Sequence, residues 1–457
     1  MSAASRLAEA GQNVIVLEKE PTIGGSSKTI FRKGFGFDFG PHNFHTTYPE
    51  IKELVREIVG EDFKKIKVNS KIFYREKWVN YPLKGIDVFT SINPLLALAC
   101  AIDFLKTRAI LWVKGKSEEN SFEEWITKRF GKKLYKIYFE PYASKVWGIN
   151  PRHLSKDCAE KRVPVLSLFE LALSVFFGKK RFHPEDPAAI KSYYPKKGVI
   201  QICEGFRRKL LKKGGRIYFN VEKIFPKTKN RKIGSINFVS NGKAFSEKCD
   251  FLVSTMPLNE LLLLFAAELK NDVESLSKKL KFRSEVLLFL AANKASVFGS
   301  SWVYFSGTRI PFNRVTEFTY FSRELAPKGK TGLCVEFTCN ENDSIWKKTD
   351  KELLQECITV FEKHGFLKKE EIEFYFTKKL PNAYPIYDLE YKKNLKKSIE
   401  CLLEIKNLAT IGRLGLFCYA NMDEAIKMGT DIADLKIKQK PLNSETYKEM
   451  FPKFVIY

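Results

Sequence analysis

Several common sequence features are missing from this chain of 457 residues, and each absence excludes a class of protein or site. The nine cysteines form no Cys-x-x-Cys pair and match no common zinc-ligand spacing, which excludes the usual structural zinc sites. No segment has the apolar length of a membrane span, and Met1–Ala10 holds Arg6 and Glu9 where a secretory signal needs an apolar core. Internal repeats and low-complexity tracts are also absent. We therefore expect reduced, mostly buried cysteines, no metal ion and a cytoplasmic location.

The composition is that of a folded, strongly basic protein. Hydrophobic residues make up 44% of the chain and aromatic residues 14%, which excludes a disordered or collagen-like protein. The length predicts two or three domains. The formal net charge of +25 would suit nucleic acid, an anionic lipid surface or an anionic small molecule. Because the basic residues are scattered and no nucleic-acid motif accompanies them, we favour a Lys-rich solvated surface and expect no nucleic-acid partner.

Two segments approach the composition of a helix that lies at a membrane surface. Pro94–Val113 is mostly apolar but contains Lys106 and Arg108, and Val163–Phe177 runs directly into the basic stretch Gly178–Arg181. An apolar helix with basic flanks can lie in the plane of a bilayer interface. We favour the alternative, in which both segments are buried helices of a substrate domain, and keep peripheral membrane contact as the second interpretation.

The start of the chain is typical of a nucleotide-binding unit. Met1–Ala10 predicts a helix, and Val14–Leu17 is an apolar run of the kind found in strands buried on both faces of a parallel sheet. Glu18 follows at once. In a Rossmann unit, an acidic residue at the end of the second strand accepts hydrogen bonds from the ribose of an adenine dinucleotide. The pattern therefore predicts a bound adenine dinucleotide near Glu18.

The first strand of such a unit and its Gly-x-Gly-x-x-Gly loop are missing, and they would have to precede Met1. That loop and the helix after it supply the backbone amides that hold the diphosphate of the nucleotide. We therefore expect the chain as written to fold less stably and to bind its nucleotide weakly.

The rest of the chain alternates strand and helix patterns, which predicts an α/β protein. A loop with paired glycines is expected at 22–29, a half-buried strand at Phe35–Phe39 and a helix at Pro49–Ile58. Short strands should follow at 70–82, and helices should dominate 85–180. The remaining expected elements are helices at Gly198–Leu211, near 350–364 and at Asp423–Leu435, strands at Arg216–Val221, Phe251–Thr255 and Leu408–Ile411, and a hairpin turn at Asn241–Gly242.

Several stretches, in this order and spacing, resemble one superfamily over nearly the whole chain. It comprises the FAD-dependent oxidoreductases of the amine oxidase and protoporphyrinogen oxidase type, with UDP-galactopyranose mutase as a relative. Gly24–Thr29 looks like the Gly-Gly-x-x-Arg-Thr flavin loop of that superfamily, with Lys28 in the place of Arg. Phe37–Phe44 is similar to the stretch beneath the isoalloxazine. Ile411–Arg413 and Tyr419–Asp423 look like the C-terminal motif that meets the ribityl chain and the flavin.

The resemblance implies FAD as the cofactor and assigns contacts to it. A cation such as Lys28 suits the diphosphate, and the amides that begin a helix at Met422 suit negative charge on the reduced flavin. The strand ending at the equivalent of Val221 lies against the adenine in the family. The predicted cofactor-binding residues are Glu18, Lys19, Gly24, Gly25, Ser26, Lys28, Gly40, Pro41, His42, Val221, Gly412, Arg413, Asn421 and Met422.

Fewer residues are candidates for catalysis or substrate contact. His42 and His45 lie in the predicted flavin-facing loop, where an imidazole can transfer a proton near neutral pH. Arg413 follows the last strand, at the edge where ligands of α/β sheets bind. For each candidate the alternative is a hydrogen-bonded or packed structural residue. We predict catalytic roles for His42, Arg413 and Tyr387, and substrate contacts for His45, Trp147, Arg162 and Tyr384.

The predicted architecture is a discontinuous, N-terminally truncated Rossmann-like FAD-binding domain with a second domain of mixed helices and strands. The FAD-binding domain is expected to use residues 1–70, 190–260 and 400–440. The substrate domain is expected to use 71–189 and 261–399, and 441–457 is expected to be a C-terminal tail.

Three functions are consistent with these features. The first is an FAD-dependent oxidoreductase that transfers a hydride from a substrate carbon to flavin N5. The alternative is a mutase-like isomerase that uses reduced FAD on a small anionic substrate such as a nucleotide sugar. The basic composition and Tyr142–Ile149, which looks like a signature of the mutase and its relatives, favour it; Val253–Pro257 resembles the oxidoreductase branch. The third is a non-enzymatic or cofactor-deficient protein.

Overall fold

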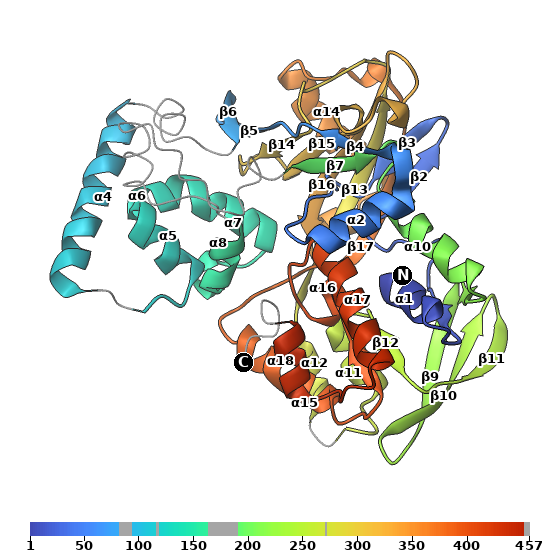
Figure 1. The fold of residues 1–457 in the computed structure, drawn as a ribbon. Coiled ribbons are helices and arrows are strands. Elements are labelled where there is room, and N and C mark those ends of the chain that lie inside the picture. The colour runs from blue at the N-terminus through green and yellow to red at the C-terminus, as the bar shows by residue number, and fades with distance from the viewer. Residues whose placement is uncertain (82–93, 116–117, 163–190, 270–271, 452–457) are drawn as a thin grey trace.

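The computed structural model describes residues 1–81, 94–115, 118–162, 191–269 and 272–451, which form a mixed α/β fold (Figure 1). A group of helices that runs from α4 (Pro94–Lys114) to α8 (Lys156–Arg162) lies to the left of a large sheet in Figure 1. The C-terminal helices and a smaller sheet lie below the large sheet.

The N-terminal segment forms one parallel strand pair with its covering helices. Helix α1 (Ser2–Glu9) leads to β1 (Ile15–Leu17), which pairs in parallel with β8 (Arg216–Tyr218). Helix α1 packs against α10 (Ile200–Lys212) and α17 (Met422–Ile437). The predicted helix and strand are confirmed, but β1 is half-buried and not fully buried, because it pairs only with β8 within the described chain.

A second parallel pair stands apart from the first. It joins β12 (Leu252–Ser254) to β18 (Leu408–Thr410). The parallel strands that the sequence assigned to one Rossmann-like sheet thus form two separate pairs in the described residues. The helices that follow these strands or close the chain are α11 (Leu258–Leu264), α12 (Val273–Lys279), α15 (Tyr391–Leu402), α16 (Gly412–Gly415) and α18 (Ser444–Met450).

Three antiparallel strands form the smaller sheet, in the order β11 (Lys243–Lys248), β10 (Lys232–Ser240), β9 (Val221–Lys229). Asn241 and Gly242 have φ angles of 49° and 71° and connect β10 to β11, which confirms the predicted hairpin. The strand predicted at Arg216–Val221 divides into β8 and β9.

The large sheet has seven strands, and all neighbours are antiparallel except β14 and β5. Their order is β17 (Ile372–Pro385), β13 (Phe282–Ala292), β16 (Thr331–Cys339), β15 (Arg314–Glu317), β14 (Trp302–Phe305), β5 (Ser70–Tyr74) and β6 (Lys77–Tyr81).

Both faces of this sheet are covered. Side chains alternate along a strand, so Val286, Leu288 and Leu290 of β13 pack with residues of α14 (Asp350–Lys363). Leu287 and the next odd-numbered residues of β13 face β3 (Phe35–Asp38). Strand β13 is therefore buried almost throughout, as expected for a strand covered on both sides.

The β3 side of the sheet is covered by two small antiparallel strand pairs. Strand β2 (Thr29–Arg32) pairs with β3, and β4 (Phe63–Ile66) pairs with β7 (Ser192–Pro195). Strand β3, which was predicted to be half-buried, is fully buried. Even its Asp38 carboxylate is covered, and it accepts hydrogen bonds from the hydroxyls of Thr29 and Tyr194 at 2.6 and 2.5 Å. The helix predicted after β3 is α2 (Pro49–Val59).

Capped helices and short turns complete the described fold. Ser121 caps α5 (Phe122–Phe130): its Oγ accepts from the Glu124 backbone N–H, and the Glu124 carboxylate accepts from Ser121 N. Other short elements are α6 (Lys132–Leu134), α7 (Glu140–Trp147), α13 (Ser344–Lys347), a π turn at Tyr135–Phe139, and 3-10 turns at Gly60–Asp62, Pro151–His153, Phe318–Tyr320, Arg323–Leu325 and Lys369–Glu371.

Helix α4 overturns the preference for a buried helix at Pro94–Val113. One face packs against α5 and α6, but large apolar side chains on the other face are exposed, from Ile102 at 45% to Trp112 at 88%. Periodicity cannot reveal this, because nearly every position of the helix is apolar. The second such segment, Val163–Phe177, lies outside the described residues. Among the helices that the structure describes, none is long and apolar enough to cross a bilayer.

The cysteines behave as predicted. All nine are free thiols, and only Cys203 and Cys249 are partly exposed. Over the described ranges, no three His, Cys, Asp or Glu side chains gather in a way that could hold a metal ion.

Candidate functional site

The predicted site residues come from distant parts of the chain and lie around two regions. One surrounds the end of β1, where Glu18 was assigned to a nucleotide. The other lies where the loop after β3 meets the large sheet, the end of β17 and the segment between β18 and α17.

Glu18 and Val221 are neighbours, as expected for one end of a nucleotide site. The Val221 backbone N–H donates to the Glu18 carbonyl at 3.0 Å. The Glu18 carboxylate accepts from the Glu20 backbone N–H at 2.9 Å, which orients it at the carboxyl end of β1. Lys19 is exposed beside it.

The paired glycines form an open turn next to a buried cation. Gly24 and Gly25 have φ angles of 113° and 56°, and a Cβ added at Gly25 would meet nothing within 4 Å. Ser26 is exposed on the same turn. Lys28 is 6% exposed, and its Nζ donates to the Thr22 hydroxyl at 3.1 Å. Burial lowers the pKa of Lys28, and the nearby Glu20 carboxylate opposes that shift.

Gly40 allows the loop after β3 to lie directly on the large sheet. Its φ is 105°, and an added Cβ would lie 3.2 Å from Oε1 of Glu336. Glycine is required here by both the backbone conformation and the close approach. Pro41 and His42 follow at once, so the loop passes over the charged side chains of the sheet.

Three charged side chains line the sheet beneath this loop, and we call them the charged face: Glu285 of β13, Arg314 of β15 and Glu336 of β16. Glu336 and Arg314 are direct cross-strand partners. Arg314 donates two hydrogen bonds to the Glu336 carboxylate, at 2.7 Å from Nε and 2.5 Å from Nη2. Glu336 is 0% exposed, so this bidentate pair is shielded from water.

Glu285 completes the charged face as a neutral acid. It is 3% exposed, and its Oε1 has no hydrogen-bond partner within the described protein. Burial first, and then the negative charge of Glu336, raise the pKa of Glu285 well above its usual value. The charged face therefore holds one cation and one anion at neutral pH.

His42 is held in its neutral form. Its Nδ1 is buried and has no hydrogen-bond partner in the described residues. Burial, together with the positive charges of Arg314 and Arg413, lowers the pKa of His42 to about 3. His45 lies beyond it, with its Nδ1 3.5 Å from the Asn43 amide nitrogen.

Arg413 joins the same region from the other side. Its guanidinium lies 4.9 Å from the ring centroid of Tyr384 and donates to the Ala420 carbonyl at 3.2 Å. Trp147 packs edge-on against Tyr384, with centroids 6.2 Å apart. Gly412 has a φ of 81° at the start of α16. The structure thus brings His42, Arg413, Tyr384 and Trp147 together.

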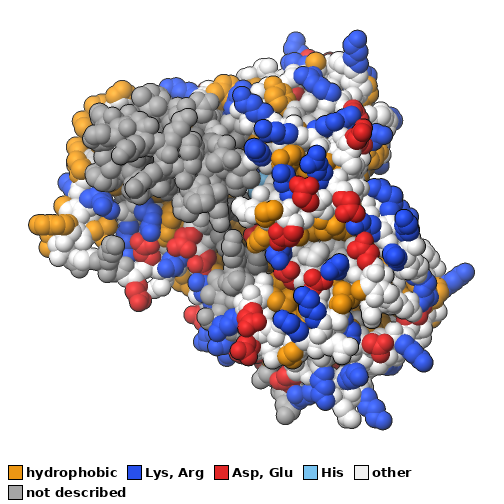
Figure 2. Space-filling view, viewed as in Figure 1, with side chains coloured by type: hydrophobic (Ala, Val, Ile, Leu, Met, Phe, Trp, Pro, Cys, Tyr) orange, Lys and Arg blue, Asp and Glu red, His pale blue; other side chains and the backbone are white. Residues whose placement is uncertain are grey.

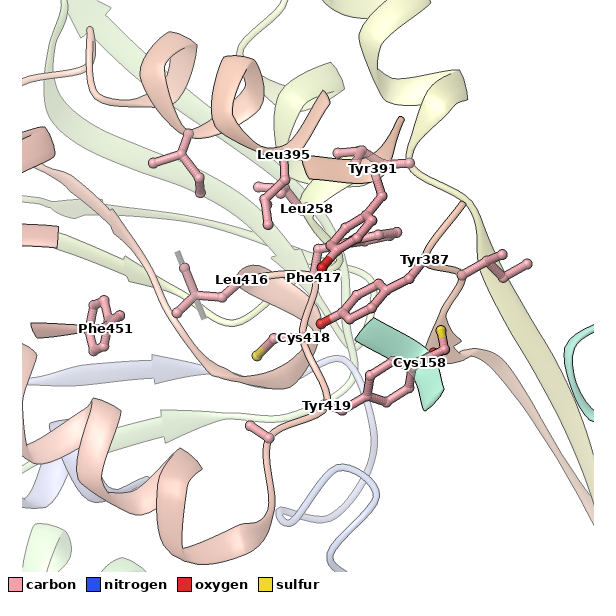
Figure 3. Packing of buried hydrophobic residues seen from close by; sticks show 14 of the residues in the cluster. Cys158, Leu258, Tyr387, Tyr391, Leu395, Leu416, Phe417, Cys418, Tyr419 and Phe451 are labelled. Atoms are coloured by element: carbon pink, nitrogen blue, oxygen red, sulfur yellow. The ribbon is translucent and has the colours of Figure 1, made fainter. Parts of the chain in front are cut away.

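Tyr387 lies in a different environment. It is 2% exposed and its ring stacks on Tyr391 with centroids 4.0 Å apart, within the packed cluster shown in Figure 3. Tyr419 and Phe417 pack against the same ring. This placement favours a packing role over the predicted catalytic one.

The start of α17 holds a buried polar atom without a protein partner among the described residues. Asn421 precedes the helix and its backbone N–H donates to Glu424 at 2.8 Å, while the helix begins at Met422. Asp423 is 5% exposed and its Oδ1 has no partner in the described residues. Two buried polar atoms without partners, this oxygen and Nδ1 of His42, fit the hydrogen-bonding groups of a flavin.

The sequence analysis did not predict the charged face. The predicted substrate residue Arg162 cannot be assigned to the site from the structure. Arg162 is the last residue of α8, and its side chain lies outside the described part. Glu285 and Glu336 each interrupt an apolar strand pattern at an inward position, which is a signal of a buried charge that needs a partner. Arg314 could be recognised only together with the strand that faces it.

Comparison with known proteins gives a consistent answer. Residues 1–378 match the flavin-containing amine oxidoreductase family. A probable UDP-galactopyranose mutase of Klebsiella pneumoniae is 30% identical over 178 residues, which are 35% of this chain and 41% of that protein. A dTDP-fucopyranose mutase of Escherichia coli is 23% identical over 94% of each chain.

The fold is also that of a known structure. A crystal structure of reduced UDP-galactopyranose mutase superimposes with a TM-score of 0.81 at 22% identity, covering 98% of this chain and 94% of the other. Together with the family match, this confirms the resemblance predicted from Gly24–Thr29, Phe37–Phe44 and Tyr419–Asp423. The chain belongs to the flavin-containing amine oxidoreductase family, the superfamily that includes UDP-galactopyranose mutase.

Proposed function

We propose that the protein is a flavin-dependent mutase that isomerises the sugar of a nucleotide sugar without net oxidation. The observation that carries this proposal is the charge balance of the site. Similarity to the dTDP-fucopyranose mutase along 94% of both chains supports it and favours this alternative over the hydride-transferring oxidoreductase that the sequence first suggested.

The site has a positive charge in excess. Arg314 is neutralised by Glu336, and burial beside the Glu336 charge raises the pKa of Glu285, which favours its uncharged form. Arg413 packs against the Tyr384 ring and donates a hydrogen bond to the Ala420 backbone carbonyl, and no carboxylate of the described residues forms an ion pair with it. A site with this balance attracts a diphosphate and repels a protonated amine. The charge therefore supports an anionic substrate.

Tyr384 gives the substrate an aromatic ring beside Arg413. Its side chain is partly exposed, so an apolar sugar face can pack on it while the diphosphate faces the guanidinium, and Trp147, which is 5% exposed, supports the ring by an edge-to-face contact. His42 is neutral, so its imidazole can accept or share a hydrogen bond without adding charge.

The residues present fit FAD. Glu18 suits the adenosine ribose, Lys28 and the open turn at Gly25 suit the diphosphate, and the amides at the start of α17 suit the flavin pyrimidine. When reduced and bound, FAD would supply an electron-rich nucleophile, so that isomerisation needs no external oxidant.

The test is isomerisation by the reduced protein. Protein reconstituted with FAD and reduced with dithionite is incubated with UDP-galactopyranose and with a dTDP-hexose, and the products are separated by chromatography. We expect a furanose product from the reduced protein and none from the oxidised protein. Oxidation of a substrate with no isomerisation would contradict the proposal, as would a purified protein that takes up no FAD.

A matched pair of arginine variants tests the anion site. Arg413→Ala should raise KM for the nucleotide sugar by at least about tenfold, because a buried charge-assisted contact contributes roughly 1.5–3 kcal/mol. Arg309→Ala, at an exposed arginine outside the site, should leave KM unchanged. Equal effects in the two variants would remove Arg413 from the substrate site.

A further inference from the structure

Helix α4 presents a long apolar ridge to solvent. We call this set the α4 ridge: Leu95, Leu98, Ile102, Leu105, Ala109 and Trp112, which alternate in spacings of three and four. Residues so spaced lie along one side of a helix, here for a length of about 25 Å. Leu95 is 77% exposed, Leu105 65% and Trp112 88%. Figure 2 shows hydrophobic side chains along the left edge of the molecule, where Figure 1 places α4.

The charges beside the ridge are positive. Lys106 and Arg108 are exposed, and neither pairs with a carboxylate in the part of the chain that the structure describes. Asp103 is the one acid in the helix sequence, and its carboxylate accepts from the Lys133 backbone N–H at 2.8 Å, on the side away from the ridge. The exposed side of α4 is therefore apolar and basic, with no exposed acid on it.

The combination of apolar and basic side chains indicates which kind of partner can cover the α4 ridge. Two copies of α4 packed together would bring Lys106 and Arg108 of each into a shared interface with no exposed carboxylate on the helix to pair with them. An anionic bilayer supplies both an apolar interior for the ridge and a negative surface for the cations, whose long stems allow the charges to reach it. Tryptophan at the helix end also suits a bilayer interface.

We propose that α4 is a membrane-surface helix that lies in the plane of an anionic bilayer, with the α4 ridge buried among the lipids and Lys106 and Arg108 at the headgroups. The net charge of +25 on the whole chain adds long-range attraction to the same surface. This interaction is independent of the proposed mutase reaction.

The test is sedimentation of the full chain with lipid vesicles. We expect the protein to bind vesicles of phosphatidylcholine mixed with phosphatidylglycerol, to bind phosphatidylcholine alone far less, and to dissociate as salt is raised. Leu98→Glu with Leu105→Glu should reduce the partition coefficient at least about tenfold. Lys106→Gln with Arg108→Gln should reduce it by a similar factor, since each basic residue near an anionic surface contributes about fivefold.

Matched controls distinguish binding through the α4 ridge from nonspecific binding through other exposed apolar or basic residues. Phe225→Glu with Leu389→Glu changes two apolar residues that are 50% and 47% exposed outside α4, and Lys64→Gln with Lys65→Gln changes two exposed lysines elsewhere. Both controls should bind vesicles like the original protein, apart from a small common loss from reduced net charge. FAD content and isomerase activity should be unchanged in the ridge variants.

Three results would overturn the proposal. One is equal binding by the ridge variants and the controls, and another is a monomeric protein that binds no vesicles. The third is a dimer in sedimentation velocity that Leu105→Glu dissociates, which would make a second copy the occupant of the ridge. None of these results depends on whether the isomerase assay succeeds.

Discussion

The charged face and the α4 ridge place side chains in opposite and equally unusual ways. The large sheet buries Glu285 and Glu336 and half-buries Arg314 beneath the loop at Gly40, whereas α4 exposes side chains such as Leu105 and Trp112. Burial of charge costs free energy unless every charge is paired, and exposure of apolar surface loses the stabilisation that burial would give.

The two regions compensate for these costs in different ways. The charged face is satisfied within the chain, because Arg314 has a bidentate partner and Glu285 keeps its proton. The side chains of the α4 ridge such as Leu105 and Trp112 are largely exposed, and we propose a lipid surface as their partner. Substitutions in the first region should therefore change folding stability, and those in the second should not.

The largest expected effect on stability comes from substituting the ionised glutamate of the charged face, and substitution of the other glutamate is its control. Glu336→Gln removes the buried charge that balances half-buried Arg314 and should reduce the free energy of unfolding by about 3–5 kcal/mol. Glu285→Gln replaces an acid that is already neutral and should cost less than about 1 kcal/mol. Urea denaturation of both variants at pH 7 measures the difference, and equal losses would show that Glu285 is ionised.

The next effect is a dependence on pH that arises at Asp38. Burial raises the pKa of this carboxyl to about 6, despite its hydrogen bonds to Thr29 and Tyr194. The folded state therefore holds the proton more tightly than the unfolded state, so stability falls as pH rises from about 4 through 6, by about 3 kcal/mol.

Asp38→Asn should lack this fall, while Asp434→Asn, at a surface carboxylate paired with Arg6, should retain it. The measurement is the urea midpoint at a series of pH values, taken as the difference from the original protein. His42 acts in the opposite direction: its lowered pKa removes stability as pH falls from about 6.5 towards 3. A difference curve for Asp38→Asn that is flat would exclude a buried titrating carboxyl.

A smaller effect should follow from adding a methyl group at Gly40, where the loop after β3 lies against the large sheet. Gly40→Ala combines a φ of 105° with a Cβ 3.2 Å from Glu336, and should cost about 1–3 kcal/mol and weaken FAD binding. Gly11 has a φ of 78° but open space around it, so Gly11→Ala measures the cost of the backbone conformation alone. Calorimetry measures the loss of unfolding free energy in each variant, and the difference between the two losses is the cost of the contact with Glu336. Equal losses would mean that the loop moves away from Glu336 freely.

Local signals in the sequence were sufficient for most elements. The hairpin turn at Asn241–Gly242 depends on only a few residues, so its conformation can be predicted from the local sequence. The FAD motifs were found in the same way, since Gly24–Thr29 is a contiguous stretch. Their assigned roles in binding remain predictions.

Features that depend on distant segments could not be predicted. Arg314 and Glu336 are 22 residues apart and meet only because β15 pairs with β16 in one register. The two parallel pairs were expected as one sheet, because strand order is not encoded in apolar runs. The predicted burial of α4 was wrong for a related reason: an apolar helix has the same pattern whether protein, lipid or solvent lies against it.

The smallest expected effect tests this last point directly. Leu105→Gln should change the free energy of unfolding by less than about 0.5 kcal/mol, because its side chain is 65% exposed and gives up no packing. Leu288→Ala, at a fully buried position of β13, should cost about 2–5 kcal/mol and serves as the buried reference. If Leu105→Gln instead costs more than about 1 kcal/mol in lipid-free solution, the α4 ridge packs against protein, and the contrast between the two regions fails.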